Sequence, residues 1–185
     1  MRAIRVVIFF CLFLIFTHSS VNEKSKIINN LKNIDNIQFK FTQKTNENIE
    51  KGKCILAFPG KLKCDYIDKN EKELIVNKKM MAITQKRYGK TLFYPLSKST
   101  FINILDKNEL IKIITESDTT TNNYFNVIFI NEEKFKTIIR FNKKDFFLAG
   151  WTSIDQYNNK VIFEIDITSF NQMIDNKIFT LPDRN

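Results

Sequence analysis

The stretch CILAFPGKLKCDY, residues 54–66, decides the fold that we predict for this chain. Pro59 and Gly60 at its centre favour a turn. On either side of that turn, every second residue is apolar or partly apolar: Cys54, Leu56 and Phe58 before it, and Leu62, Cys64 and Tyr66 after it. Successive side chains of a strand point to opposite faces, so the stretch predicts a β-hairpin with one apolar face that carries two cysteines.

The pairing register of this hairpin decides whether the two cysteines can bond. If Cys54 lies opposite Cys64, a disulfide can form in an oxidising compartment. If Leu56 lies opposite Cys64, the cysteines are diagonal neighbours about 7–8 Å apart, too far for an unstrained bond. The sequence leaves both registers open, with two small buried apolar residues as the alternative to a disulfide.

The N-terminus has the pattern of a secretory signal peptide. Arg2 and Arg5 precede a continuous apolar run over residues 6–16, and Thr17 and Ser19 are small residues suited to cleavage. The run is too short to span a bilayer comfortably. We therefore expect residues 1–20 to be removed, leaving a single exported domain over 21–185.

Removal of that segment restricts the chemistry of the remaining chain. It takes away Cys11 and the one histidine, His18, and lowers the formal net charge from +9 to +7, since Arg2 and Arg5 are lost with no acid. Without histidine there is no Ser-His or Cys-His pair, and two cysteines alone do not complete a zinc site. The four glycines are too scattered for a phosphate-binding loop. We expect no enzyme activity, no cofactor and no metal.

Charged residues give no sign of another activity. Four carboxylates lie close together in the sequence among lysines and an asparagine, which is typical of an exposed loop rather than of a glycosidase pair: Asp65, Asp68, Glu71 and Glu73. We interpret the positive net charge as a solvated surface rather than as a nucleic-acid site.

The rest of the chain alternates between strand-like and helix-like patterns. Helical spacing of apolar residues predicts a first helix over 25–36, and a second over 97–110 that Ser97 or Ser99 would cap, with Phe101, Ile104 and Leu105 on one face. Strands are predicted over 37–45, the hairpin, 73–77, 80–86, 90–96, 111–117, 124–131, 135–142, 146–154 and 160–170.

Short polar connections between these strands predict an antiparallel meander. A sheet of roughly ten strands must curl. The fold class that we expect is therefore mainly β with a few helices (α+β): a curled antiparallel sheet that forms an unclosed β-barrel with a helical lid.

Five segments, in order and spacing, resemble one known family, the LolA-type periplasmic outer-membrane lipoprotein carriers. They are IQFKFTQKT (37–45), GKCILAFPGKLKCDY (52–66), ELIVNKKMMAITQK (73–86), YPLSKSTFINIL (94–105) and IFTLPD (178–183). The resemblance implies a chaperone that binds the acyl chains of lipoproteins in a hydrophobic cavity and carries them from the inner to the outer membrane. Its implied partners are acylated lipoproteins and an inner-membrane lipoprotein-releasing ABC transporter; an outer-membrane acceptor is a further candidate. We expect a monomer.

One position departs from the family pattern. Many such carriers have an arginine before the hairpin proline that hydrogen-bonds to the lid, whereas this chain has Phe58 before Pro59. An apolar lid contact at Phe58 is the substitute that we expect. The residues predicted to line the acyl-chain cavity are Phe39, Phe41, Leu56, Phe58, Leu62, Tyr66, Leu74 and Val76.

Three other functions compete with a lipoprotein carrier. A periplasmic lipid-sensing regulatory protein would share the fold. A secreted basic nucleic-acid or polysaccharide binder would need exposed aromatic residues beside lysines on one face. Lys40, however, points away from Phe39 and Phe41 in an alternating strand. A carboxylate-based hydrolase is the weakest alternative.

Overall fold

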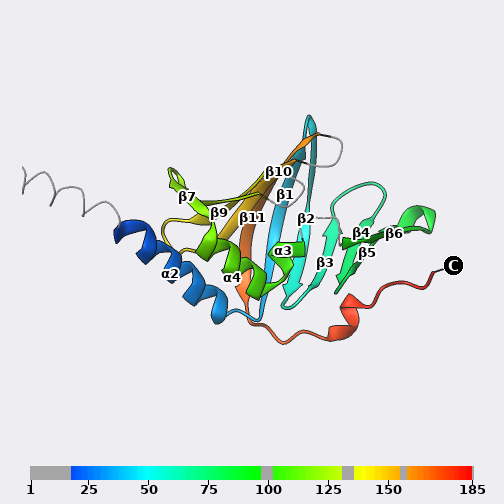
Figure 1. The fold of residues 1–185 in the computed structure, drawn as a ribbon. Helices are drawn as coiled ribbons and strands as arrows, with labels where there is room; N and C mark the ends of the chain where they lie inside the picture. Colours follow the sequence, from blue (N-terminus) through cyan, green and yellow to red (C-terminus); the bar gives the residue numbers. More distant parts are fainter. Residues whose placement is uncertain (1–17, 97–101, 131–135, 155–157, 185) are drawn as a thin grey trace, which may run out of the picture.

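The computed structural model describes residues 18–96, 102–130, 136–154 and 158–184. These residues form an 11-stranded antiparallel sheet in the order β6-β5-β4-β3-β2-β1-β11-β10-β9-β8-β7. The strands are β1 (Asn36–Thr45), β2 (Asn48–Ala57), β3 (Lys61–Tyr66), β4 (Lys72–Asn77), β5 (Met80–Gln85), β6 (Lys90–Pro95), β7 (Asp118–Thr121), β8 (Tyr124–Ile130), β9 (Lys136–Asn142), β10 (Leu148–Ile154) and β11 (Lys160–Phe170). β6 and β7 are the two end strands, and in the described residues they do not pair with each other, so the sheet is unclosed. Figure 1 shows that it is also curled, as the sequence predicted.

Helices cover one face of this sheet. They are α2 (His18–Lys32), α3 (Ile102–Leu105) and α4 (Lys107–Glu116), with short 3-10 turns η1 (Lys86–Tyr88) and η3 (Asn176–Phe179) elsewhere. Figure 1 shows α2 and α4 crossing the sheet side by side, with α3 next to them. We call α2, α3 and α4 the lid, and the sheet face beneath them the inner face.

The lid helices form where apolar residues recur at helical spacing. In α2, Ile27 and Leu31 are buried one turn apart. In α4, the buried residues Leu110, Ile113 and Ile114 lie on one face. The Asp106 side chain caps α4 by accepting hydrogen bonds from the backbone amides of Asn108 and Glu109.

Three sequence predictions are corrected by this region. Residues 111–117, predicted as a strand, are mostly the second half of α4, because the cap at Asp106 starts a helix that continues to Glu116. Residues 118–121, expected to be a connection, form the edge strand β7. Ile34 is buried but lies beyond the end of α2. The predicted caps Ser97 and Ser99, and Phe101, lie outside the described residues, as does most of the predicted signal peptide.

The hairpin β2–β3 has the register that places its cysteines opposite each other. Cys54 pairs with Cys64 and Leu56 with Leu62, and the two cysteines form a disulfide. Both are buried on the inner face. The turn between the strands contains Gly60 at φ 70°, a left-handed conformation that glycine adopts without steric cost.

Candidate functional site: an apolar pocket beneath the lid

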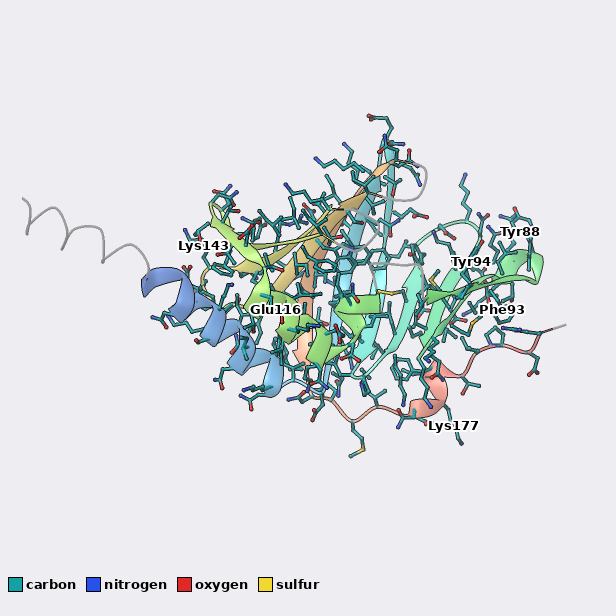
Figure 2. The ribbon with its side chains drawn as sticks, in the orientation of Figure 1. Tyr88, Phe93, Tyr94, Glu116, Lys143 and Lys177 are labelled. Carbon is teal, nitrogen blue, oxygen red and sulfur yellow. A yellow bond between two sulfur atoms is a disulfide. The ribbon has the colours of Figure 1, made fainter. Side chains whose placement is uncertain are left out.

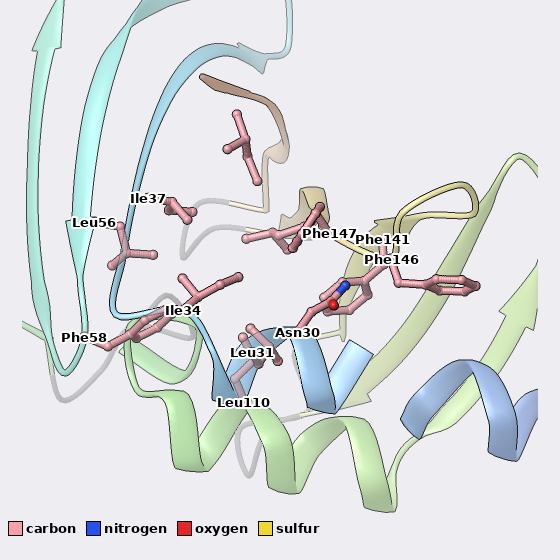
Figure 3. Close-up of a pocket in the computed structure, with 12 residues that line it drawn as sticks. Asn30, Leu31, Ile34, Ile37, Leu56, Phe58, Leu110, Phe141, Phe146 and Phe147 are labelled. Carbon is pink, nitrogen blue, oxygen red and sulfur yellow. The ribbon is translucent and has the colours of Figure 1, made fainter. Parts of the chain in front are cut away.

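A pocket lies between the lid and the inner face of the sheet (Figure 3). Its wall combines residues from both halves of the chain, because β1 and β11 are neighbours in the sheet. Eleven of its twelve lining residues are apolar: Leu31, Ile34, Ile37, Leu56, Phe58, Leu110, Phe141, Phe146, Phe147, Leu148 and Ile167, with Asn30 as the polar member. Such a surface binds apolar groups through contacts that have no preferred direction.

The pocket is small in this structure. The space open to the centre of a water molecule is about 20 Å³. A void needs roughly 10–15 Å³ in this measure to hold a single water molecule. The pocket therefore admits about one water and is too small for an acyl chain. The open hydrophobic cavity that the family resemblance implies is not present in the described part of this structure.

The turn between β2 and β3 meets the lid through three contacts. The Phe58 side chain lines the pocket together with Leu110 of α4. The backbone amide of Gly60 donates a hydrogen bond to the carbonyl oxygen of Leu105 at 2.8 Å. The Lys107 ammonium lies 5.5 Å from the centre of the Phe58 ring and 3.5 Å from the Asp35 carboxylate. Phe58 thus occupies the position at which the family pattern has an arginine, and the contact with the lid is made by its side chain and by the backbone hydrogen bond of Gly60.

The two longer lid helices are joined to each other and to the sheet by polar contacts at the lid surface. The Lys24 ammonium of α2 donates to the carbonyl oxygens of Thr115 (3.0 Å) and Ser117 (2.9 Å) at the end of α4. A cation is favourable there because the carbonyl groups of a helix C-terminus carry partial negative charge. The Asn30 side-chain amide donates to the carbonyl oxygen of Asp145, in the β9–β10 turn, at 2.8 Å.

That β9–β10 turn supplies the aromatic wall of the pocket. The amide of Phe146 donates to the carbonyl oxygen of Asn142, and the amide of Asn142 donates to the carbonyl oxygen of Phe147, both at 2.9 Å. These bonds hold Phe146 and Phe147 beneath α2, as Figure 3 shows. The Phe147 ring lies 4.5 Å from the ring of Phe170 at the end of β11.

The residues predicted to line the cavity divide into three groups. Two of them, Leu56 and Phe58, line the pocket. Four are buried in the core on the inner face: Phe39, Phe41, Leu62 and Val76. Tyr66 and Leu74 are half-buried against the same core.

An aromatic cluster explains why Phe41 and Tyr66 lie away from the pocket. The centre of the Phe41 ring lies 4.9 Å from that of Tyr66 and 5.0 Å from that of Phe163. The Phe163 ring in turn stacks on Trp151, with 4.2 Å between ring centres. Such ring pairs fill space and stabilise the core beyond their buried area. The cluster thus fills its part of the inner face, whereas the pocket remains where the lid meets the sheet.

The side chains of the pocket wall carry no charge. None of its lining residues is titratable, and in the described parts of the chain no group of His, Cys, Asp and Glu side chains could hold a metal ion. Outside the pocket, burial and then the nearby Glu50 carboxylate raise the pKa of Tyr66, so its hydroxyl is neutral at physiological pH. The Lys72 ammonium, ion-paired with Glu50, lies 3.7 Å from the centre of the Tyr66 ring.

Fold and pocket together define a structural class, in which a curled antiparallel sheet and a helical lid enclose an apolar site. Over residues 32–182 the chain matches the family model for the outer membrane lipoprotein carrier protein LolA, and it belongs to that family. This confirms the family resemblance in the sequence. No curated protein sequence matches the chain. None of the described helices is long and apolar enough to cross a membrane.

Solved structures are similar to this chain at low sequence identity. An uncharacterized conserved protein from Thermus thermophilus has a TM-score of 0.54 and 6% identity, covering 89% of this chain and 95% of its own. A DUF1329 family protein from Desulfovibrio piger has a TM-score of 0.50 and 6% identity, with 89% and 98% coverage. A LolA superfamily protein from Nitrosomonas europaea has a TM-score of 0.44 and 7% identity, with 85% and 97% coverage.

Proposed function

We propose that this chain is a periplasmic carrier that holds the acyl chains of lipoproteins between its lid and its sheet and moves them from the inner to the outer membrane. An inner-membrane lipoprotein-releasing ABC transporter would load it, and residues 1–20 would direct it to the periplasm. It acts as a binding protein rather than an enzyme. The observation that carries the proposal is the apolar pocket at the seam between lid and sheet, in a member of the lipoprotein carrier family.

The task demands a large apolar surface. Burial of each CH₂ group stabilises by about 0.8 kcal/mol, so one long acyl chain in water costs on the order of 12 kcal/mol. The closed pocket does not offer this surface, but the contact between lid and sheet does. The side chains that the lid buries include Ile27, Leu31, Leu110, Ile113 and Ile114.

Competition between the lid and the cargo makes release feasible. When acyl chains enter, they replace contacts that the lid makes with the sheet. The net free energy of binding is therefore the difference between the apolar contacts that the cargo makes and those that the lid loses. Polar bonds from Lys24, Asn30 and Gly60 add to this apolar contact at the lid surface. The main cost of opening is the exposure of the apolar side chains that the lid buries; an acyl chain that covers them offsets this cost, and closing can expel the chain.

Three binding titrations test the proposal. The purified chain lacking residues 1–20 is mixed with a fluorescent acylated peptide and, separately, with the same peptide without the acyl group and with single-stranded DNA. We expect saturable binding of the acylated peptide that changes little with salt. Salt-sensitive DNA binding without acyl binding would contradict the proposal.

A matched pair of variants places the binding in the pocket. Ile167→Trp puts a larger side chain on the inner face of β11, at the pocket, and should weaken acyl binding at least about tenfold by filling the site. Ile162→Trp makes the same change on the opposite face of the same strand, since Ile162 is an odd number of positions, five, from Ile167. Equal loss of acyl binding in both variants would argue against the pocket.

A further inference from the structure

The edge of the sheet farthest from α2 exposes large apolar side chains. β6 is the last strand of the sheet, and η1 leads into it. Exposed fractions are 63% for Tyr88, 44% for Leu92 and 41% for Tyr94. Figure 2 shows Tyr88, Phe93 and Tyr94 gathered at this end of the molecule, away from α2 and α4. We call η1 and β6 together the β6 end.

An apolar row connects the β6 end to the pocket. The register of β2 to β6 places five residues side by side on the inner face: Leu56, Leu62, Val76, Met81 and Tyr94. The first three are buried, Met81 is half-buried and Tyr94 is exposed. The row therefore runs from the wall of the pocket, at Leu56, to the open edge. A parallel row ends in the same way, with half-buried Ile83 next to exposed Leu92.

The same region carries positive charge. Residues 74–105 contain no Asp or Glu, and their six cations are Lys78, Lys79, Lys86, Arg87, Lys90 and Lys98. The first five are described and exposed. Only Lys86 among those five has a carboxylate within ion-pair distance in the described structure, from Glu73 and Asp65. The loop before β4 brings Asp68 and Glu71 next to η1. Over residues 61–96, which form β3 to β6, nine Lys and Arg side chains outnumber four Asp and Glu side chains, so the exposed aromatic residues still lie on a part of the surface with net positive charge, which attracts anions.

We propose that the β6 end docks on an anionic lipid bilayer. Tyrosine rings favour the interface between headgroups and acyl chains, where one end of the ring is apolar and the other is wet. Lysine and arginine are attracted to anionic headgroups while their alkyl stems cover apolar surface. Contact by a few side chains without a membrane-spanning helix is peripheral and reversible.

An acidic protein segment that pairs with the free edge of β6 is the other class of partner that this charge would attract. The apolar row favours the bilayer, because it offers a continuous path for apolar chains between a membrane and the lid. The docking surface goes beyond the carrier function, although the choice of a bilayer as its occupant rests on that proposed function; the test uses no lipoprotein, so failure of docking and failure of acyl binding are distinguishable.

Vesicle flotation tests the docking surface. The chain lacking residues 1–20, whose apolar run would itself bind lipid, is mixed with phosphatidylglycerol-containing vesicles or with pure phosphatidylcholine vesicles. We expect it to float with the anionic vesicles at low salt and to be released by high salt. Arg87→Glu with Lys90→Glu should lower the apparent affinity at least about tenfold. Leu92→Ser should lower it severalfold without changing the salt dependence.

The opposite side of the sheet supplies a control. Ile130 and Lys136 are exposed register partners on β8 and β9, so Ile130→Ser with Lys136→Glu removes one exposed apolar side chain and reverses one charge there. This variant should float like the unaltered chain. A reporter variant, Tyr88→Trp, should shift its emission to the blue with anionic vesicles, since the natural Trp151 is buried.

Three results would overturn the proposal: no flotation of the unaltered chain, equal flotation with neutral vesicles, or equal loss in the control variant. Binding of a soluble acidic peptide at the β6 end in the absence of vesicle binding would assign the surface to a protein partner instead. Circular dichroism of each variant distinguishes loss of docking from loss of folding.

Discussion

Cys54 and Cys64 lie directly opposite each other on β2 and β3 and are joined by a disulfide on the buried inner face. The bond closes a short loop, with a sequence separation of 10. The disulfide links the two strands of the hairpin, and this hairpin contributes Leu56 and Phe58 to the pocket wall.

Loss of this disulfide should destabilise the protein. The entropy of closing a loop of this length corresponds to about 2–3 kcal/mol, so the double variant Cys54→Ala, Cys64→Ala should unfold at correspondingly lower urea concentration. A reducing agent should lower the urea midpoint of the unaltered chain and leave that of the double variant unchanged. A midpoint of the unaltered chain that is insensitive to reduction would contradict this role.

Lys24 should control the opening of the lid. Its ammonium links α2 to the last carbonyl groups of α4, and hydrogen bonds from a charged donor contribute about 1.5–3 kcal/mol when partly buried, less at a surface. Lys24→Met should therefore speed amide hydrogen exchange in α4 and quicken exchange of the acylated probe. Lys112→Met alters an exposed lysine of α4 and should do neither. Unchanged exchange in Lys24→Met would show that α4 is held by apolar packing alone.

Glu73 should contribute to stability in a pH-dependent way. Burial acts to raise the pKa of Glu73, but hydrogen bonds from the Lys63 and Lys86 ammonium groups outweigh it and hold the pKa below its usual 4.5. A carboxylate whose pKa is lowered by folding stabilises the folded state above its unfolded pKa, and this contribution is lost as pH falls through the folded pKa. The loss therefore begins below about pH 5 and is complete below the lowered pKa.

The variant Glu73→Gln should accordingly reduce the difference in urea midpoint between pH 7 and pH 3. The exposed Glu116, at the end of α4, supplies the comparison through Glu116→Gln. An acid-induced loss of stability of the same size in Glu73→Gln and in the unaltered chain would show that Glu73 is not the group responsible.

Gly150 should not tolerate alanine. Its φ of 138° is one that residues with a side chain rarely adopt, and an added Cβ would lie 2.0 Å from the carbonyl oxygen of Phe163. The Arg140 guanidinium occupies the remaining space and donates to that same oxygen at 3.0 Å. Gly150→Ala should cost on the order of 2–4 kcal/mol of unfolding free energy.

Gly89 provides the control for this substitution, because it also has a positive φ, 58°, but no atom lies within 4 Å of an added Cβ. Gly89→Ala should cost only about 1 kcal/mol, from the backbone conformation alone. Similar urea midpoints for the two variants would mean that the crowding at Gly150 is relieved by a small movement of the strands.

The sequence predicted the strands well and the lid less well. Alternation of apolar residues marked the inner face of β1 to β3 and of β8 to β11 because one face of each strand is buried. In α4, Ile111 and Ile113 are two positions apart, which is the alternation expected of a strand. Reading them together with Leu110 and Ile114 restores the helical spacing, and Asp106 is the cap that should have indicated it.

The pocket was predicted only in part because alternation identifies the inner face and not the area beneath the lid. Leu56 and Phe58 were found since they lie in the hairpin that meets α4. Phe141, Phe147 and Ile167 come from strands and a turn that approach β1 only through the pairing of β1 with β11. That long-range pairing leaves no local signal in the sequence.

Photo-crosslinking in cells tests the central claim most directly. A photoreactive phenylalanine analogue replaces Phe58, at the pocket, or Tyr124, which is exposed on β8. We predict adducts with lipid-modified proteins at position 58 and none at position 124. The absence of lipoprotein adducts at position 58, or equal amounts at both positions, would contradict the account.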